Sequence, residues 1–113
     1  MALSHTLPIY KDTYKLILLI FERTKNFSRE YKYTLGQDLK RDGINLVRSI
    51  YRANRSKNKR EHLEEFLDNF EILKLEIRLC TDLKLLSVKQ LAEISQMLDI
   101  IGRQATAWKN STQ

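Results

Sequence analysis

Cysteine, proline and glycine are scarce in this chain. Its 113 residues include one cysteine, one proline and three glycines. The single cysteine, Cys80, excludes a disulfide within the chain and any zinc site built from several cysteines. So few prolines and glycines leave little room for long loops or many tight turns, which these residues usually mark. The composition is rich in leucine, lysine, arginine, glutamate and isoleucine, so we expect an all-α fold.

The chain also lacks a long apolar segment. Its longest uninterrupted apolar run covers residues 16–21, far short of the ~20 residues that a membrane-spanning helix needs. The first ten residues have neither the basic flank nor the apolar stretch of a signal peptide. We therefore expect a cytoplasmic protein with no membrane partner. A chain of this length normally forms one domain, so a single domain over residues 1–113 is expected.

Residues suited to catalysis are few. The two histidines are His5, near the start of the chain, and His62, which lies among glutamates and is typical of a solvated surface residue. No phosphate-binding or dinucleotide-binding loop motif occurs. No acid precedes a histidine by three residues, as the ligand motif of di-iron bundles requires. We expect no catalytic residue, no metal site, no cofactor and no enzymatic activity.

The clearest pattern in the chain is the helical periodicity of its apolar residues. Apolar residues recur in heptad steps of three and four over 63–80 and again over 91–108. Ser87 and Gln90 have the spacing of a capping box, which predicts a helix start. Helices are predicted at about residues 8–24, 29–54, 60–84 and 88–108. Four such helices with short connections favour an antiparallel, up-down-up-down four-helix bundle.

Apolar residues outside the predicted core stripes suggest a second surface. In the first helix, Tyr10, Tyr14, Ile17 and Phe21 step by four, three and four residues and form the predicted core stripe. Other apolar residues point away from this stripe and from the heptad stripe of the third helix. The predicted subunit-interface residues are Leu16, Leu19, Ile20, Ile72, Leu75 and Leu79. The alternative is that they are scattered surface leucines and isoleucines, which are normal.

Positive charge is concentrated in one part of the chain. The formal net charge is +6, and residues 43–60 contain six basic residues and no acid. The spacing of seven, four and three residues from Arg41 onward places four arginines on one helix face, opposite an apolar face. The candidate nucleic-acid-binding residues are Arg41, Arg48, Arg52, Arg55, Lys57, Lys59 and Arg60.

Such a surface has two interpretations. It can bind nucleic acid through phosphate contacts that do not depend on base sequence, with flanking Tyr33, Ile44 and Tyr51 available for stacking or packing. It can equally be a solvated helix face, or a docking site for an acidic protein. The spacing of the charges does not decide between them.

Two longer segments carry a family resemblance. FSREYKYTLGQDLKRDGINLVRSIYRANRS and RLCTDLKLLSVKQL resemble the accessory variability determinant proteins of diversity-generating retroelements. The most specific parts are REYKYTLGQ and DLKLLS, and the resemblance runs from about Pro8 to Trp108. The wider relatives are four-helix bundle proteins encoded by intervening sequences in bacterial large-subunit ribosomal RNA genes. One departure is Ser28, where family members are expected to carry proline often. Either residue can start a helix.

The resemblance implies more than the residue pattern does. It implies that the bundle assembles as a homopentameric barrel with a basic surface. It also implies a non-enzymatic accessory role, in which the protein binds the element's reverse transcriptase and template RNA during mutagenic complementary DNA synthesis and retrohoming. The alternative is a structural or interaction module of the intervening-sequence type, with no direct role in nucleic-acid binding.

Overall fold

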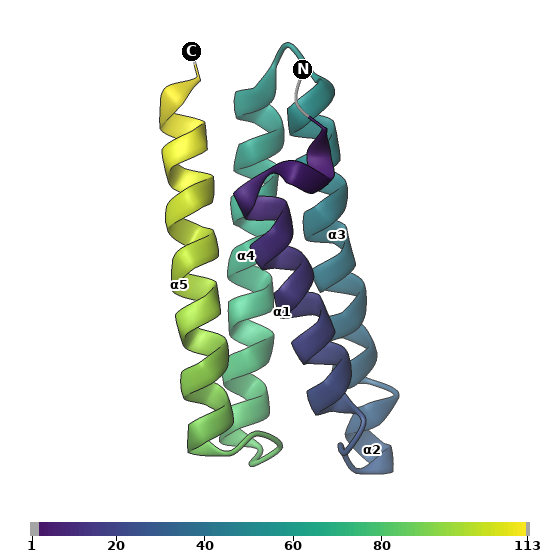
Figure 1. Ribbon diagram of the computed structural model, residues 1–113. Coiled ribbons are helices and arrows are strands. Elements are labelled where there is room, and N and C mark those ends of the chain that lie inside the picture. Colours follow the sequence, from purple (N-terminus) through teal and green to yellow (C-terminus); the bar gives the residue numbers. More distant parts are fainter. Residues whose placement is uncertain (1–2, 113) are drawn as a thin grey trace.

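The protein is a four-helix bundle, seen here in a computed structural model that describes residues 3–112 (Figure 1). Its long helices are α1 (Pro8–Thr24), α3 (Leu35–Arg55), α4 (Lys59–Asp82) and α5 (Val88–Ser111). Two single-turn elements complete the described chain, the 3-10 helix η1 (Ser4–Thr6) and the short helix α2 (Arg29–Lys32). The bundle measures 43 × 23 × 22 Å, and each long helix packs against two neighbours in the cyclic order α1, α3, α4, α5. The predicted all-α, up-down-up-down arrangement is confirmed.

The heptad stripe of α4 forms the centre of the core. All six of its members are buried: Leu63, Phe66, Phe70, Leu73, Ile77 and Cys80. The rings of Phe66 and Phe70 stack with their centroids 5.9 Å apart. From α5, Ile94, Ile101 and Ala105 close the core opposite them. This regular burial follows from the predicted period of three and four residues.

The face of α1 that meets the core differs from the prediction. Tyr14 and Phe21 are exposed, whereas Leu16 and Ile20, predicted for a subunit interface, are 0% and 2% exposed within the bundle. Leu19 is half-buried against the core. The core face also includes Thr13 and Thr24. Because these two residues are polar, the core face of α1 does not stand out as an apolar stripe in the sequence. The Thr24 hydroxyl donates to the carbonyl of Ile20, 2.8 Å away, so this polar side chain is satisfied inside the core.

The helix predicted over 29–54 is interrupted between α2 and α3. Tyr33 and Thr34 leave the helical conformation, and Thr34 has φ −119° and ψ −92°. The Thr34 hydroxyl donates to the carbonyl of Glu30 at 2.9 Å, which satisfies the end of α2. Gly36 then allows the chain to pass close to itself, because a Cβ there would lie 3.2 Å from the Tyr31 carbonyl oxygen.

Two backbone hydrogen bonds hold the turn between α4 and α5. Leu85 N–H bonds the Cys80 carbonyl at 2.8 Å, and Lys84 N–H bonds the Thr81 carbonyl at 3.0 Å. These are the two bonds of a Schellman motif, and Lys84 occupies its left-handed position with φ 62°. The predicted capping box of Ser87 and Gln90 then begins α5. Across residues 3–112, no helix is both long and apolar enough to cross a bilayer.

Candidate nucleic-acid interface

Helix α3 carries the central part of the predicted basic surface. Its inner face buries Leu39, Leu46 and Ile50, which fixes the opposite side toward solvent. The outward side is a ridge of alternating arginine and apolar or aromatic residues: Arg41, Ile44, Arg48, Tyr51 and Arg55. These residues recur every three or four positions, so their side chains emerge along one line. We call this line the α3 ridge.

Arg41, at the start of the α3 ridge, is locally neutralised. Its guanidinium lies 3.3 Å from Asp38 and 3.3 Å from Asp42. The hydrogen bond and the charge of Asp42 raise the pKa of Arg41 further above its usual value, with a smaller contribution from Asp38. A cation held between two carboxylates contributes little to the attraction of a polyanion.

Arg52 lies beside the α3 ridge and contacts the neighbouring helix. Its guanidinium lies 3.7 Å from the carboxylate of Glu65 on α4. The four arginines that the sequence assigned to one stripe therefore divide into two groups. Arg48 and Arg55 face outward, whereas Arg41 and Arg52 form ion pairs with nearby acids.

Lys59 and Arg60, also predicted to bind nucleic acid, hydrogen-bond to helix ends. The Lys59 ammonium donates to the carbonyls of Ala53 and Asn54, at 2.9 and 2.8 Å, and so closes the C-terminal end of α3. Arg60 donates to the carbonyl of Lys109 near the end of α5, at 3.4 Å, and pairs with Glu64 at 3.4 Å. Positive charge at a helix C-terminus stabilises the helix, so both residues have a structural role.

Three basic residues remain available to a partner. In the part of the chain that the structure describes, Arg48, Arg55 and Lys57 take part in no ion pair or side-chain hydrogen bond. All three are exposed and lie on the outer half of α3 or in the loop that follows it. They form the part of the predicted surface that carries uncompensated positive charge.

Aromatic side chains flank these cations. The Tyr10 ring lies between two others, stacked on Tyr14 with centroids 6.2 Å apart and tilted against Tyr51 at 5.9 Å. A hydrogen bond with Tyr51 is the main cause that raises the pKa of Tyr10. Sequence reasoning placed Tyr10 and Tyr14 in the core stripe and so missed this cluster. Tyr33, predicted on the flank of the basic surface, is exposed but lies at the break between α2 and α3.

A buried carboxyl pair lies between α3 and α4, beneath Arg41. Glu76 is 8% exposed, and its Oε1 has no hydrogen-bond partner. Burial raises the pKa of Glu76 to about 8, and a hydrogen bond with Asp42 and the charges of Asp42 and Asp38 add to the effect. This pair could not be recognised in the sequence, where Glu76 is one of several acids spread along the same predicted helix.

The predicted interface residues of α4 are exposed. Ile72, Leu75 and Leu79 are 52%, 53% and 42% exposed and lie along one line of the helix. On α1 the exposed large hydrophobic residues are Tyr14, Leu18 and Phe21, whereas the predicted Leu16 and Ile20 are buried. The surface therefore has an apolar strip on α4, which we call the α4 strip, and a separate apolar patch on α1.

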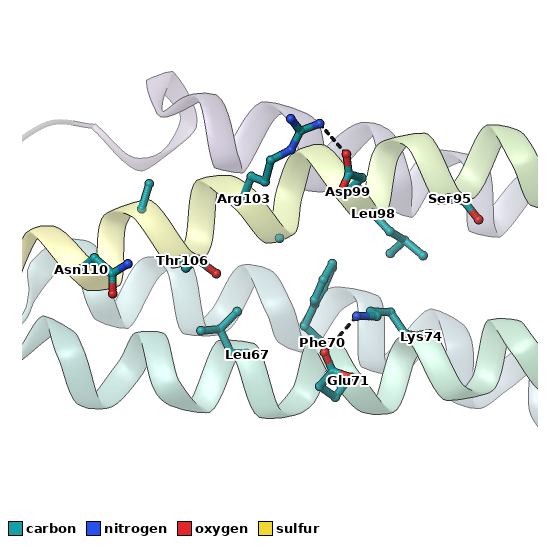
Figure 2. A pocket seen from close by; sticks show the side chains of 12 residues that line it. Leu67, Phe70, Glu71, Lys74, Ser95, Leu98, Asp99, Arg103, Thr106 and Asn110 are labelled. Carbon is teal, nitrogen blue, oxygen red and sulfur yellow. Dashed lines mark hydrogen bonds and ion pairs between the residues drawn. The ribbon is translucent and has the colours of Figure 1, made fainter.

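In the described part of the chain, His, Cys, Asp and Glu side chains do not form a cluster that could bind a metal ion. Burial raises the pKa of the Cys80 thiol to about 12, with a smaller contribution from Glu76, so this thiol stays protonated in the core. A groove of about 700 Å³ on the α4–α5 seam has an apolar floor of Leu67, Phe70 and Leu98 (Figure 2). Its rims carry the ion pairs Lys74–Glu71 and Arg103–Asp99.

Comparison with known families adds one finding. The sequence model of the bAvd-like family matches residues 7–112 of this chain. The match includes all four long helices and the whole basic segment from Arg41 to Arg60. No curated protein matches the chain.

Proposed function

Because the chain belongs to the bAvd-like family, the accessory proteins of diversity-generating retroelements, we propose that it binds the template RNA and reverse transcriptase of such an element. In this proposal the protein is not an enzyme and acts in the cytoplasm to support mutagenic complementary DNA synthesis. One observation carries the RNA-binding part. Within residues 3–112, Arg48, Arg55 and Lys57 are exposed and form no ion pair, while the other basic residues of the segment contact acids or helix ends.

Phosphate contacts explain how this surface would hold RNA. Neutralising three phosphates of a single strand releases the counterions bound to them, so affinity falls with salt, with a log–log slope of about −2 per subunit. Contacts to phosphate position a nucleic acid without reading its sequence. Specificity for template RNA would then come from RNA shape or from the polymerase partner.

We include a homo-oligomer, a pentamer by the family resemblance, in the same proposal. The α4 strip supports it, because a row of exposed isoleucine and leucine side chains gains stability when a second surface covers it. A symmetric assembly repeats Arg48, Arg55 and Lys57 around its axis. Repetition raises the overall affinity for one long RNA without any new contact per subunit.

Binding of a template RNA fragment across a salt series tests the proposal. Replacing Arg48, Arg55 and Lys57 by glutamate should lower affinity at least 30-fold at low salt and flatten the salt slope. The matched control replaces Lys15, Lys84 and Lys89, which are exposed elsewhere on the bundle, by glutamate. Both triple variants lose the same charge, so an equal loss in both would show that net charge, rather than this surface, binds the RNA.

A second experiment separates RNA binding from polymerase binding. In this proposal, the purified reverse transcriptase of the same retroelement should co-elute with the wild-type protein on size exclusion. If the polymerase binds while no RNA binding is detected at low salt, the protein is an interaction module, which is the alternative that the sequence left open. If neither partner binds, the proposed function is wrong.

A further inference from the structure

A pocket of about 420 Å³ opens at the end of the bundle where α3 gives way to α4. It is lined by Leu7, Asn54, Arg55, Ser56, Lys57, Lys59 and Trp108. These residues come from three parts of the chain: the segment before α1, the α3–α4 connection and the end of α5. All three meet at the end of the molecule that is uppermost in Figure 1. The volume falls within the range of about 300–1,000 Å³ that is usual for small-molecule sites. We call this cavity the end pocket.

The lining of the end pocket combines positive charge with an aromatic wall. Arg55 and Lys57 are exposed and form no ion pair with the described part of the chain, while Lys59 is held in place by the two carbonyls at the end of α3. Trp108 and Leu7 supply apolar surface; both are half-buried and pack against the core. Among residues 3–112, no aspartate or glutamate lines the cavity. A ligand with a flat apolar part and a negatively charged part would match both halves of this lining.

Two glutamates of the first turns of α4 have partners of their own. Glu61 accepts a hydrogen bond from the Asn58 amide at 2.9 Å. Glu64 lies 3.4 Å from Arg60 and 4.0 Å from Lys109, so two cations already balance its charge. Among residues 3–112, neither Arg55 nor Lys57 forms an ion pair with these glutamates.

We propose that the end pocket binds one unpaired nucleotide of a single-stranded nucleic acid, with the base stacked on Trp108 and the adjoining phosphates on Arg55 and Lys57. This inference rests on the proposed RNA binding and adds a contact with a base to contacts with phosphates. Single-strand-binding proteins use the same combination, because every base has a flat face that stacks on an aromatic ring whatever its identity. An acidic peptide would use the cations but would leave the indole wall without a partner.

Trp108 is the only tryptophan of the chain, so its fluorescence reports on the end pocket alone. Titration of the full chain with a short oligouridylate at low salt should quench this emission. An abasic ribose-phosphate chain of equal length should bind but leave the emission nearly unchanged, because it has no base to stack. Anisotropy of a labelled oligonucleotide measures binding independently in the same solutions.

Two variants locate the contact. Trp108→Leu should weaken oligouridylate binding about 10-fold while leaving binding of the abasic chain unchanged. Because Trp108 also packs against the core, the double variant Arg55→Glu, Lys57→Glu gives a second test that keeps the indole in place, and it should abolish the quenching. The control variant Lys84→Glu, Lys89→Glu should retain the quenching.

The outcomes distinguish the two proposals. Binding by anisotropy without quenching, or equal quenching by the abasic chain, overturns the end pocket as a nucleotide site and leaves the proposed function standing. Equal quenching by polyglutamate shows a general anion site and also overturns the inference. Absence of oligonucleotide binding at low salt contradicts the proposed function itself.

Discussion

At the scale of single residues, the partners of a charged side chain decide what it can do. Seven basic residues between 41 and 60 look equivalent in the sequence. In the structure Arg41 and Arg52 neutralise acids, whereas Lys59 and Arg60 bind carbonyl groups at helix ends. Charge counting therefore overestimates the binding surface, because carbonyl acceptors are present in every residue and leave no mark in the sequence.

The buried carboxyl of Glu76 predicts an unusual dependence of stability on pH. Its folded-state pKa of about 8 lies above the ordinary value of 4.5, so the folded protein keeps a proton that the unfolded chain has lost. The free energy of unfolding should therefore fall as pH rises from about 4.5 to about 8. Glu76→Gln removes the charge and should stabilise the protein by about 1–2 kcal/mol at pH 9, with little effect below pH 5. This figure is less than the full pKa shift would give, because water reaches the Asp42 side of the pair.

Chemical denaturation at a series of pH values measures this effect. Glu71→Gln is the matched control, because Glu71 lies on the same helix but is exposed and pairs with Lys74. A stability that rises with pH in the wild-type protein, or an equal response in both variants, would contradict the assignment to Glu76.

At the scale of helices and turns, the sequence predicted those elements whose pattern has one interpretation. The heptad stripe of α4 continues without a break from Leu63 to Cys80, and Ser87 with Gln90 has the spacing of a capping box; both are confirmed. The core face of α1 could not be identified from the sequence, because residues 14–21 are apolar on two sides of the helix and the observed core face includes two threonines. The break at Tyr33 and Thr34 was missed because neither residue is a proline or a glycine, and the nearby Gly36 already lies inside α3.

The turn after α4 makes a prediction at this scale. Lys84 holds φ 62°, a conformation that costs an L-residue about 1 kcal/mol and costs glycine almost nothing. Lys84→Gly should therefore raise the free energy of unfolding by about 0.5–1 kcal/mol, measured by urea denaturation. The same replacement at Lys15, exposed in the middle of α1, should lower it by about 1 kcal/mol. Destabilisation of equal size at both positions would show that the turn gains nothing from glycine.

At the scale of the whole molecule, the two unpartnered surfaces lie on different helices. The α4 strip is apolar, and the uncompensated cations lie on α3 and in the loop beyond it. The proposed contacts between subunits and the proposed contacts with RNA would therefore use different residues. The all-α bundle could be predicted from composition and periodicity. The end pocket could not, because its lining residues come from three segments that are distant in the chain.

The α4 strip predicts how self-association responds to charge. Leu75→Glu with Leu79→Glu should reduce the molar mass measured by light scattering, because two buried carboxylates would oppose any interface formed there. The helical circular dichroism spectrum should be retained, since both side chains are exposed in the bundle. Val88→Glu, at an exposed apolar position at the start of α5, is the control and should leave the mass unchanged. An unchanged mass in the double variant would mean that the α4 strip faces solvent.

The up-down-up-down topology also has a practical consequence for handling the protein. The N- and C-terminal ends of the described chain lie at the same end of the bundle as the connection between α3 and α4 (Figure 1). An affinity tag or fluorophore attached at either terminus would stand beside the end pocket and compete there with a ligand. The connection between α4 and α5, at the opposite end of a molecule 43 Å long, is the place where a label leaves that region free.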